Sequence, residues 1–318
     1  MSHRLCVAPM MDWTDRHCRF FLRQVSSRAR LYTEMITTGA LIHGDVERHL
    51  AFSKEEHPLG AQLGGSEPED LAYCAKLVEQ YGYDEVNLNC GCPSERVQRG
   101  AFGACLMAEP DLVSECIERI RSGTQLPVTV KHRTGIDKVE EYSFVRDFVG
   151  TVSLAGCTTF IVHARNAILK GLSPKENREV PPLKYDYVYR LKQDFPALTI
   201  VINGGIVSRD QINLHLEHVD GVMLGRAAYH NPWLLADAGK TRAEVVGKMA
   251  AYARDAIAMG FSLRNVTRHM LGLYHATPRA RLWRRMLSDS ALLQRNDPAL
   301  LLQALDAVES GGSMMMAA

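Results

Sequence analysis

The chain has 318 residues, of which 46% are hydrophobic and 23% are charged, as in an ordinary soluble globular protein with room for one large domain and a smaller one. Its formal net charge of +1 excludes a basic surface over the whole molecule, so a nucleic-acid site would have to be local. The first twenty residues lack the apolar core of a signal peptide, no apolar stretch suits a membrane span, and eight scattered cysteines predict reduced thiols in the cytoplasm.

Eight short apolar segments, each suited to a β-strand, recur along the first 226 residues. They span 5–10, 30–35, 58–65, 85–93, 128–133, 159–165, 199–205 and 221–226. Helical periodicity fits between most of them, as in 69–82 and in 110–123, where a proline stands at the expected start and a glycine at the expected end. This alternation predicts a parallel sheet, either closed as a (β/α)₈ barrel or open and doubly wound.

Polar residues at the carboxyl ends of these strands favour the barrel. They are Gln62, Asn89, Cys92, Lys131, His163, Asn203 and Arg226. In a (β/α)₈ barrel such ends converge on one face, where the active site is built. From about residue 241 the pattern is helical only. We therefore predict a (β/α)₈ barrel over residues 1–240, followed by a small all-helical domain over residues 241–318.

Two glycine-containing strand ends predict a phosphate site. Asn203, Gly204 and Gly205 close the seventh predicted strand, and Gly225 and Arg226 close the eighth. Glycine lets backbone N–H groups approach phosphate oxygens, arginine adds a charged donor, and barrels commonly bind phosphate after these two strands. The alternative is a pair of tight turns without a ligand. The pattern does not say whether the phosphate would belong to a flavin or to a substrate.

Lys131 and His163 close the fifth and sixth predicted strands. A lysine over the barrel mouth can neutralise an anionic flavin ring or form a Schiff base. Either residue could instead be a strand end that is exposed or merely hydrogen-bonded. Because both would face the same space, we predict a polar cluster that suits the pyrimidine edge of a flavin.

The turn after the fourth predicted strand carries a candidate catalytic thiol. Gly91 and Pro93 predict a sharp exit that presents Cys92 to the barrel mouth, and a protonated thiol can act as a general acid. Cys90 is expected to point inward and pack in the barrel core, and Cys105 to be buried rather than reactive. Because no second CxxC pair or histidine partner accompanies these cysteines, we predict no metal site.

A local basic segment, residues 264–285, contains six arginines, two histidines and no acidic residue. A solvated helix face usually mixes both charges, so this segment favours RNA binding through phosphate contacts and base stacking. Trp283 within it is expected to be a packing anchor. The candidate RNA contacts are Arg281, Arg284 and Arg285 here, and Lys175 and Arg178 in the loop after the sixth strand.

Seven motifs in order along the chain resemble the tRNA-dihydrouridine synthase family. They are Ala8-Pro9-Met10, LNCGCP at 88–93, GACLM at 103–107, VTVKHRTG at 128–135, VHAR at 162–165, INGG at 202–205 and GRAAYHNP at 225–232. The A-type branch of that family is the more similar one. Its likeness extends to MDWTDRHCRFFLR at 11–23, SPKENREVPPL at 173–183 and TRHMLGLYH at 267–275.

The resemblance implies an enzyme that uses NADPH and FMN to reduce uridine in tRNA. It implies that FMN is bound by Ala8, Pro9, Met10, Gln62, Lys131, His163, Asn203, Gly204, Gly205, Gly225 and Arg226. Hydride would pass from reduced FMN to C6 of an unstacked uracil, with Cys92 protonating C5 and Asn89 beside the base. The A-type branch implies positions 20 and 20a of the D-loop. We infer tRNA as a partner and no protein partner.

Three alternatives stay open. An FMN barrel acting on a free pyrimidine would explain the barrel residues but leave the arginine-rich helices without a role. An aldolase-like barrel would use Lys131 to form a Schiff base with a sugar phosphate. A non-catalytic RNA-binding protein would leave the polar cluster at the strand ends unexplained.

Overall fold

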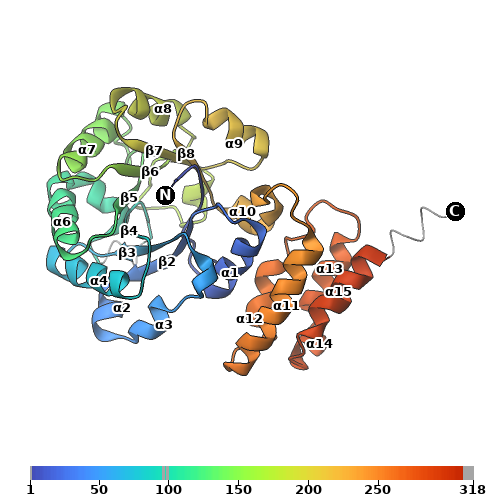
Figure 1. Cartoon of the computed structure of the whole chain (residues 1–318). Coiled ribbons are helices and arrows are strands. Elements are labelled where there is room, and N and C mark those ends of the chain that lie inside the picture. Colours follow the sequence, from blue (N-terminus) through green and yellow to red (C-terminus); the bar gives the residue numbers. More distant parts are fainter. Residues whose placement is uncertain (1, 95–96, 98–99, 311–318) are drawn as a thin grey trace. The chain divides into compact units, whose positions relative to one another are not determined.

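The computed structural model describes residues 2–94, 97 and 100–310 of the chain. It forms two compact units, which Figure 1 shows in sequence colours. The first unit comprises Met1–Met11 and Ala29–Gly225, and the second comprises Asp12–Arg28 and Arg226–Ala318. Among the described residues, no helix combines the length and the apolar character that a membrane span requires.

The first unit contains an eight-stranded parallel barrel (Figure 1). Its strands are β1 (Leu5–Val7), β2 (Leu31–Thr37), β3 (Leu59–Gly64), β4 (Glu85–Cys90), β5 (Val128–Arg133), β6 (Thr159–His163), β7 (Thr199–Asn203) and β8 (Gly221–Leu224). Neighbours pair in chain order from β2 to β8, and β8 pairs with β1. A bridge between Cys6 and Arg30 joins β1 to the segment before β2. The predicted (β/α)₈ barrel is confirmed.

Helices surround this barrel and alternate with its strands (Figure 1). They are α2 (Thr38–His43), α3 (Val46–Leu50), α4 (Pro68–Gln80), α6 (Pro110–Gly123), α7 (Tyr142–Leu154), α8 (Tyr185–Asp194) and α9 (Arg209–His215), with the 3₁₀ turns η1 (Lys54–Glu56), η2 (Gly103–Ala108) and η3 (Glu176–Arg178). The helix predicted over 110–123 is α6, which begins at the proline that needs no amide partner there. Its buried residues recur at helical spacing, so one face packs inward.

Strand alternation corrects the prediction for Cys90. Asn87 and Asn89 point into the barrel, where they hydrogen-bond side chains of neighbouring strands. With a period of two, Cys90 therefore faces the surrounding helices. Its register partner His132 lies 5.1 Å from the ring of Phe148 in α7. Cys90 is fully buried, as expected, but it packs between the sheet and the helix layer rather than inside the barrel.

An ionic cluster fills the barrel near the amino end of β4. The buried carboxylate of Glu85 accepts hydrogen bonds from Tyr32 at 2.8 Å and Thr129 at 2.6 Å. It also pairs with Arg30 at 2.9 Å and His3 at 2.8 Å. Burial opposes ionisation of Glu85, but its hydrogen bond with His3 and the nearby charges hold its pKa below the usual range. This end of a barrel serves stability rather than catalysis.

The second unit is helical. It contains α1 (Arg16–Val25), α10 (Arg226–His230), η4 (Pro232–Leu235), α11 (Arg242–Ala258), α12 (Leu263–Met270), α13 (Ala280–Ser288), α14 (Ser290–Gln294) and α15 (Ala299–Glu309). Although α1 lies between β1 and β2 in the sequence, Phe20 stacks on Tyr252 of α11 at 3.9 Å, and His17 lies 2.8 Å from the same tyrosine's hydroxyl. This unit therefore combines residues 12–28 with the residues from Arg226 onward.

Candidate active site

Asn89 shapes the turn that carries Cys92. Its Oδ1 accepts hydrogen bonds from the backbone N–H groups of Gly91 and Cys92, both at 3.0 Å. Its Nδ2 donates to Gln62 Oε1 at 2.8 Å, which fixes the orientation of the amide. The thiol of Cys92 is half-buried two residues beyond β4, 3.6 Å from the hydroxyl of Ser94. Asn89 thus holds the thiol-bearing turn against the barrel.

Gln62 is a buried residue of the barrel interior. Only 1% of it is exposed. Its Nε2 donates to Asn87 Oδ1 at 2.7 Å, and Asn87 in turn donates to Thr129 at 2.7 Å. Both ends of the Gln62 amide are therefore engaged by protein. Gln62 supports Asn89 from below, through a hydrogen-bonded row that crosses β3, β4 and β5.

Lys131 is half-buried and His163 is buried, and their side-chain nitrogens have no hydrogen-bond or ion-pair partner among the described residues. Desolvation and the charge of Arg133 lower the pKa of Lys131 to about 7. Desolvation, Arg133 and Lys131 hold the pKa of His163 well below its usual range. Positive charges thus crowd this space without a carboxylate paired to Lys131 or Arg133 in the described chain. Such a cluster suits an anionic or electron-rich ligand.

Arg133 is a site residue that the sequence reasoning missed. Only 4% of it is exposed, and its guanidinium donates to three backbone carbonyls. Nε donates to Gly91 at 3.1 Å, and Nη1 donates to Asn166 at 3.2 Å and to Asn177 at 2.9 Å. Arg133 therefore ties the Cys92 turn to the loop after β6. Strand periodicity could have identified Arg133 as a site residue, because residues 131 and 133 share a face of β5.

The turn after β7 forms a cradle that only glycine fits. Gly204 and Gly205 have φ values of +116° and +70°. A Cβ on Gly204 would lie 2.7 Å from His163 Cδ2, and one on Gly205 would lie 2.9 Å from the hydroxyl of Tyr185. Asn203 braces the turn by donating to Met223 O at 2.8 Å. Consecutive glycines with positive φ can turn backbone N–H groups toward an anion.

The ends of β8 and β1 adjoin each other in the barrel. A Cβ on Gly225 would meet only open space, so packing does not demand a glycine there, and Arg226 follows as the first residue of α10. Ala8 donates its N–H to Leu224 O at 2.8 Å, which holds the exit of β1 beside that of β8. Pro9 is half-buried, and Met10 packs against a buried cluster inside the barrel that includes Tyr32, Ile161 and Met223.

The loop after β6 brings one of its two predicted cations near the cluster. Arg178 is exposed at the end of η3, and its charge helps lower the pKa values of Lys131 and His163. Lys175, at the start of the same turn, is exposed on the surface. Buried Asn177 anchors the loop, since it donates to Ile168 O at 2.8 Å and accepts from Ile168 N at 2.7 Å.

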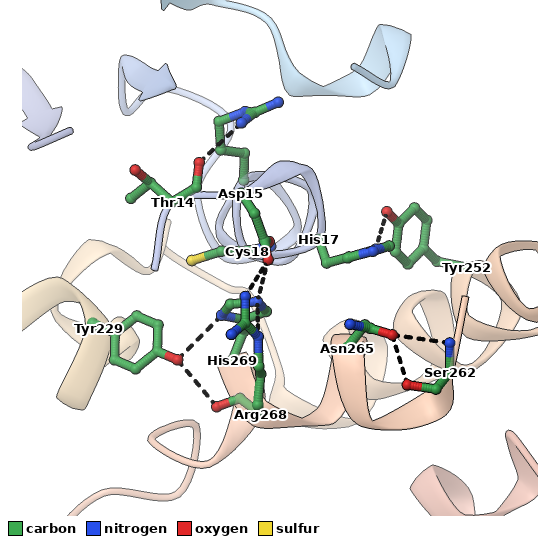
Figure 2. A network of polar contacts seen from close by, with 11 residues as sticks. Thr14, Asp15, His17, Cys18, Tyr229, Tyr252, Ser262, Asn265, Arg268 and His269 are labelled. Carbon is green, nitrogen blue, oxygen red and sulfur yellow. Dashed lines mark hydrogen bonds and ion pairs between the residues drawn. The ribbon is translucent and has the colours of Figure 1, made fainter. Parts of the chain in front are cut away.

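The basic segment of the second unit divides into structural and exposed residues. Asp15 pairs with Arg268 and, at 3.0 Å, with His269, and Tyr229 lies 3.1 Å from the other ring nitrogen of His269 (Figure 2). Burial opposes ionisation of Asp15, but the hydrogen bond from His269 holds its pKa well below the usual range. Arg268 therefore has an acidic partner 253 residues away in sequence, which a count of local charges cannot reveal.

The arginines of α13 are free of such a partner. Arg281, Arg284 and Arg285, here called the α13 arginines, are exposed and make no ion pair within the described chain. Trp283 between them is fully buried and donates Nε1–H to Met270 O at 2.9 Å, so its predicted role as a packing anchor is confirmed. One face of α13 thus carries the exposed arginines, while the buried Trp283 anchors the opposite face to the rest of the helical unit.

The remaining cysteine predictions concern Cys105 and metal binding. Cys105 is half-buried, its thiol lies 3.1 Å from Phe102 O, and burial raises its pKa. It is therefore less enclosed than expected, though not activated as a nucleophile. Within the described residues, no group of three or more histidine, cysteine or acidic side chains could hold a metal ion.

Fold and site together define a (β/α)₈-barrel enzyme with an anion-suited cluster and a thiol at the carboxyl ends of its strands. A solved structure of 2-naphthoyl-CoA reductase shares this fold, with a TM-score of 0.55 and 11% sequence identity. The match covers 73% of this chain and 49% of that one. At this identity the likeness shows the fold alone.

Sequence comparisons give the family. The family model for dihydrouridine synthase matches residues 6–309, so the chain belongs to this family of flavin-dependent enzymes. It is similar to proteins named tRNA-dihydrouridine(20/20a) synthase. The one from Vibrio cholerae is 54% identical over 92% of this chain and 93% of its own length. The one from Synechocystis is 53% identical over 98% of this chain and 96% of its own length. The one from Pseudomonas syringae is 55% identical over 97% of this chain and 95% of its own length.

Proposed function

We propose that this member of the dihydrouridine synthase family, which reduces uridine to dihydrouridine in tRNA, acts at positions 20 and 20a of the D-loop, with FMN as its flavin and NADPH as the reductant, in the cytoplasm. The observation that carries the proposal is a half-buried thiol close to Lys131 and His163, whose side-chain nitrogens have no hydrogen-bond or ion-pair partner among the described residues. The relatives' shared name and their near full-length similarity supply the tRNA substrate and its positions.

The residues of the barrel mouth fit FMN. The Gly204–Gly205 cradle suits a single phosphate, because its two positive-φ glycines leave no room for a Cβ. Lys131 and His163 have nitrogens available for the polar edge of the ring. We assign the remaining contacts to Ala8, Pro9, Met10, Gln62, Asn203, Gly225 and Arg226. When bound, the flavin supplies hydride chemistry.

The chain's own residues supply the proton and the positioning. Cys92 holds a proton on Sγ and delivers it to C5 of the uracil, while Asn89 keeps the thiol-bearing turn in place. Lys131 and Arg133 lie near enough for their charges to interact with Cys92. The base must leave its stack to reach this thiol.

RNA recognition falls to cations outside the flavin residues. We assign residues 1–240 to catalysis and residues 241–318 to tRNA binding, with the α13 arginines as phosphate contacts in the helical part. Lys175 and Arg178 add cations at the loop after β6. Because phosphate contacts dominate affinity for nucleic acid, binding should weaken steeply as salt concentration rises.

A reconstitution experiment tests the proposal. Heat-released flavin is identified by chromatography, and the holoenzyme is then given NADPH with unmodified tRNA or with free uridine. We expect FMN, and NADPH oxidation coupled to dihydrouridine formation in tRNA only. Recovery of FAD would contradict the single-phosphate cradle. Equal reduction of free uridine would favour the free-pyrimidine enzyme instead.

A further inference from the structure

A cavity in the helical unit has no role in the proposed reaction. It has a volume of about 520 Å³ and opens beside η4, the start of α11, the connection from α12 to α13, and the end of α15. Its lining includes Trp233, Lys240, Arg242, Tyr274 and Glu309. The volume falls in the range of about 300–1,000 Å³ that is usual for small-molecule sites. A planar heteroaromatic group with an attached anion would fit these residue types.

Arg242 lines this cavity close to two aromatic rings. Its guanidinium lies 4.3 Å from the ring centre of Trp233 and 5.4 Å from that of Tyr274. Nε donates to Leu273 O at 2.9 Å, which fixes the side chain, while its terminal nitrogens make no hydrogen bond to any described residue. An arginine guanidinium can stack on a nucleobase and still donate to a phosphate.

Two further side chains complete the chemistry of the cavity. Lys240 makes no side-chain hydrogen bond or ion pair with the described residues, so its ammonium is available to an anion. On another side, Glu309 accepts from Tyr274 at 2.6 Å through Oε1 and leaves Oε2 for a second donor. Lys240 and Arg242 could thus bind a phosphate, and the Glu309 carboxylate could accept a hydrogen bond from a base N–H or a ribose hydroxyl.

We propose that this cavity binds one unstacked nucleotide of the tRNA substrate, outside the uridine that is reduced. The proposal rests on tRNA being the substrate. Position supports RNA over a free nucleotide, because Pro278 of the cavity lining is followed within three residues by the first of the α13 arginines. A strand whose phosphates run along α13 therefore has an adjacent pocket into which one base can turn.

Photocrosslinking tests the pocket in the wild-type holoenzyme. The protein is irradiated in the presence of transcribed tRNA and digested, and nucleotide adducts are located by mass spectrometry. We expect adducts at Trp233 or Tyr274. In parallel, Lys240→Glu should raise the Kd for tRNA by about tenfold at low salt, with the KM for NADPH unchanged. Lys248→Glu is the matched control, because Lys248 is an exposed lysine of α11 that does not line the cavity.

The outcomes separate this inference from the proposed function. Wild-type binding of tRNA without adducts in the cavity, and with equal effects of Lys240→Glu and Lys248→Glu, would overturn the inference alone. A raised KM for NADPH with unchanged tRNA affinity would assign the cavity to the nucleotide half of NADPH and also overturn it. If the wild-type protein fails to bind tRNA, both the inference and the proposed function fall.

Discussion

Replacing Arg133 with methionine should separate positioning of the Cys92 turn from flavin chemistry. The substitution leaves three backbone carbonyls without their charged donor but also removes a buried charge, so we expect a net loss of about 2–4 kcal/mol in unfolding free energy. The turn would no longer be tied to the loop after β6. A shift of about 1 Å in a catalytic group can reduce the rate by about 10²-fold, which is the loss we expect in uridine reduction.

Stopped-flow measurements of flavin absorbance provide the assay for Arg133. Oxidation of the reduced flavin by tRNA should slow in Arg133→Met, while reduction by NADPH stays near the wild-type rate. Arg133→Lys should recover part of the loss, since an ammonium can still reach some of the carbonyls. Arg146→Met, at an exposed arginine of α7, is the control for a lost guanidinium. Wild-type uridine reduction in Arg133→Met would refute the positioning role.

Three further predictions concern single features of the site. Cys92→Ala should leave flavin reduction by NADPH intact and slow uridine reduction by about 10²–10⁴-fold, with Cys105→Ala as a near-normal control; equal loss in both half-reactions would mean a structural Cys92. Neutralising the α13 arginines together should weaken tRNA binding. It should also lower the slope of log binding constant against log salt concentration by slightly less than about one unit for each lost phosphate contact. Unchanged binding across salt concentrations would exclude α13 as an RNA surface. The folded pKa of Lys131 lies near 7 against 10.5 for the free side chain, so the folded protein binds fewer protons over that window. Stability of the flavin-free protein should therefore rise from pH 7 to pH 9, less so in Lys131→Met; equal rises in denaturant titrations would contradict this.

The barrel could be predicted because its local signals agree with one another. Eight apolar segments, helical periodicity between them and polar strand ends all indicate the same architecture, and each depends on residues near in sequence. Six of the eight strand ends were predicted one to three residues too late, as in 85–93 against Glu85–Cys90, whereas β2 ends two residues beyond its predicted end. The reason is that turn residues such as Cys92 continue the apolar pattern after the last ladder hydrogen bond.

Contacts between distant segments could not be predicted in this way. The partners of Asp15 lie more than 250 residues along the chain, and α1 packs on helices that follow the barrel. Nothing in residues 12–28 distinguishes them from an ordinary barrel helix. The predicted direction of Cys90 was wrong for a different reason, since the inward-facing positions of β4 are those of Asn87 and Asn89.

Mapping of modified nucleosides in tRNA tests the central claim most directly. tRNA from cells that lack this protein is digested, and dihydrouridine is located by mass spectrometry. The proposed function predicts uridine in place of dihydrouridine at positions 20 and 20a, restored by the wild-type gene but not by Cys92→Ala. Unchanged dihydrouridine at both positions in the deletion strain would contradict it.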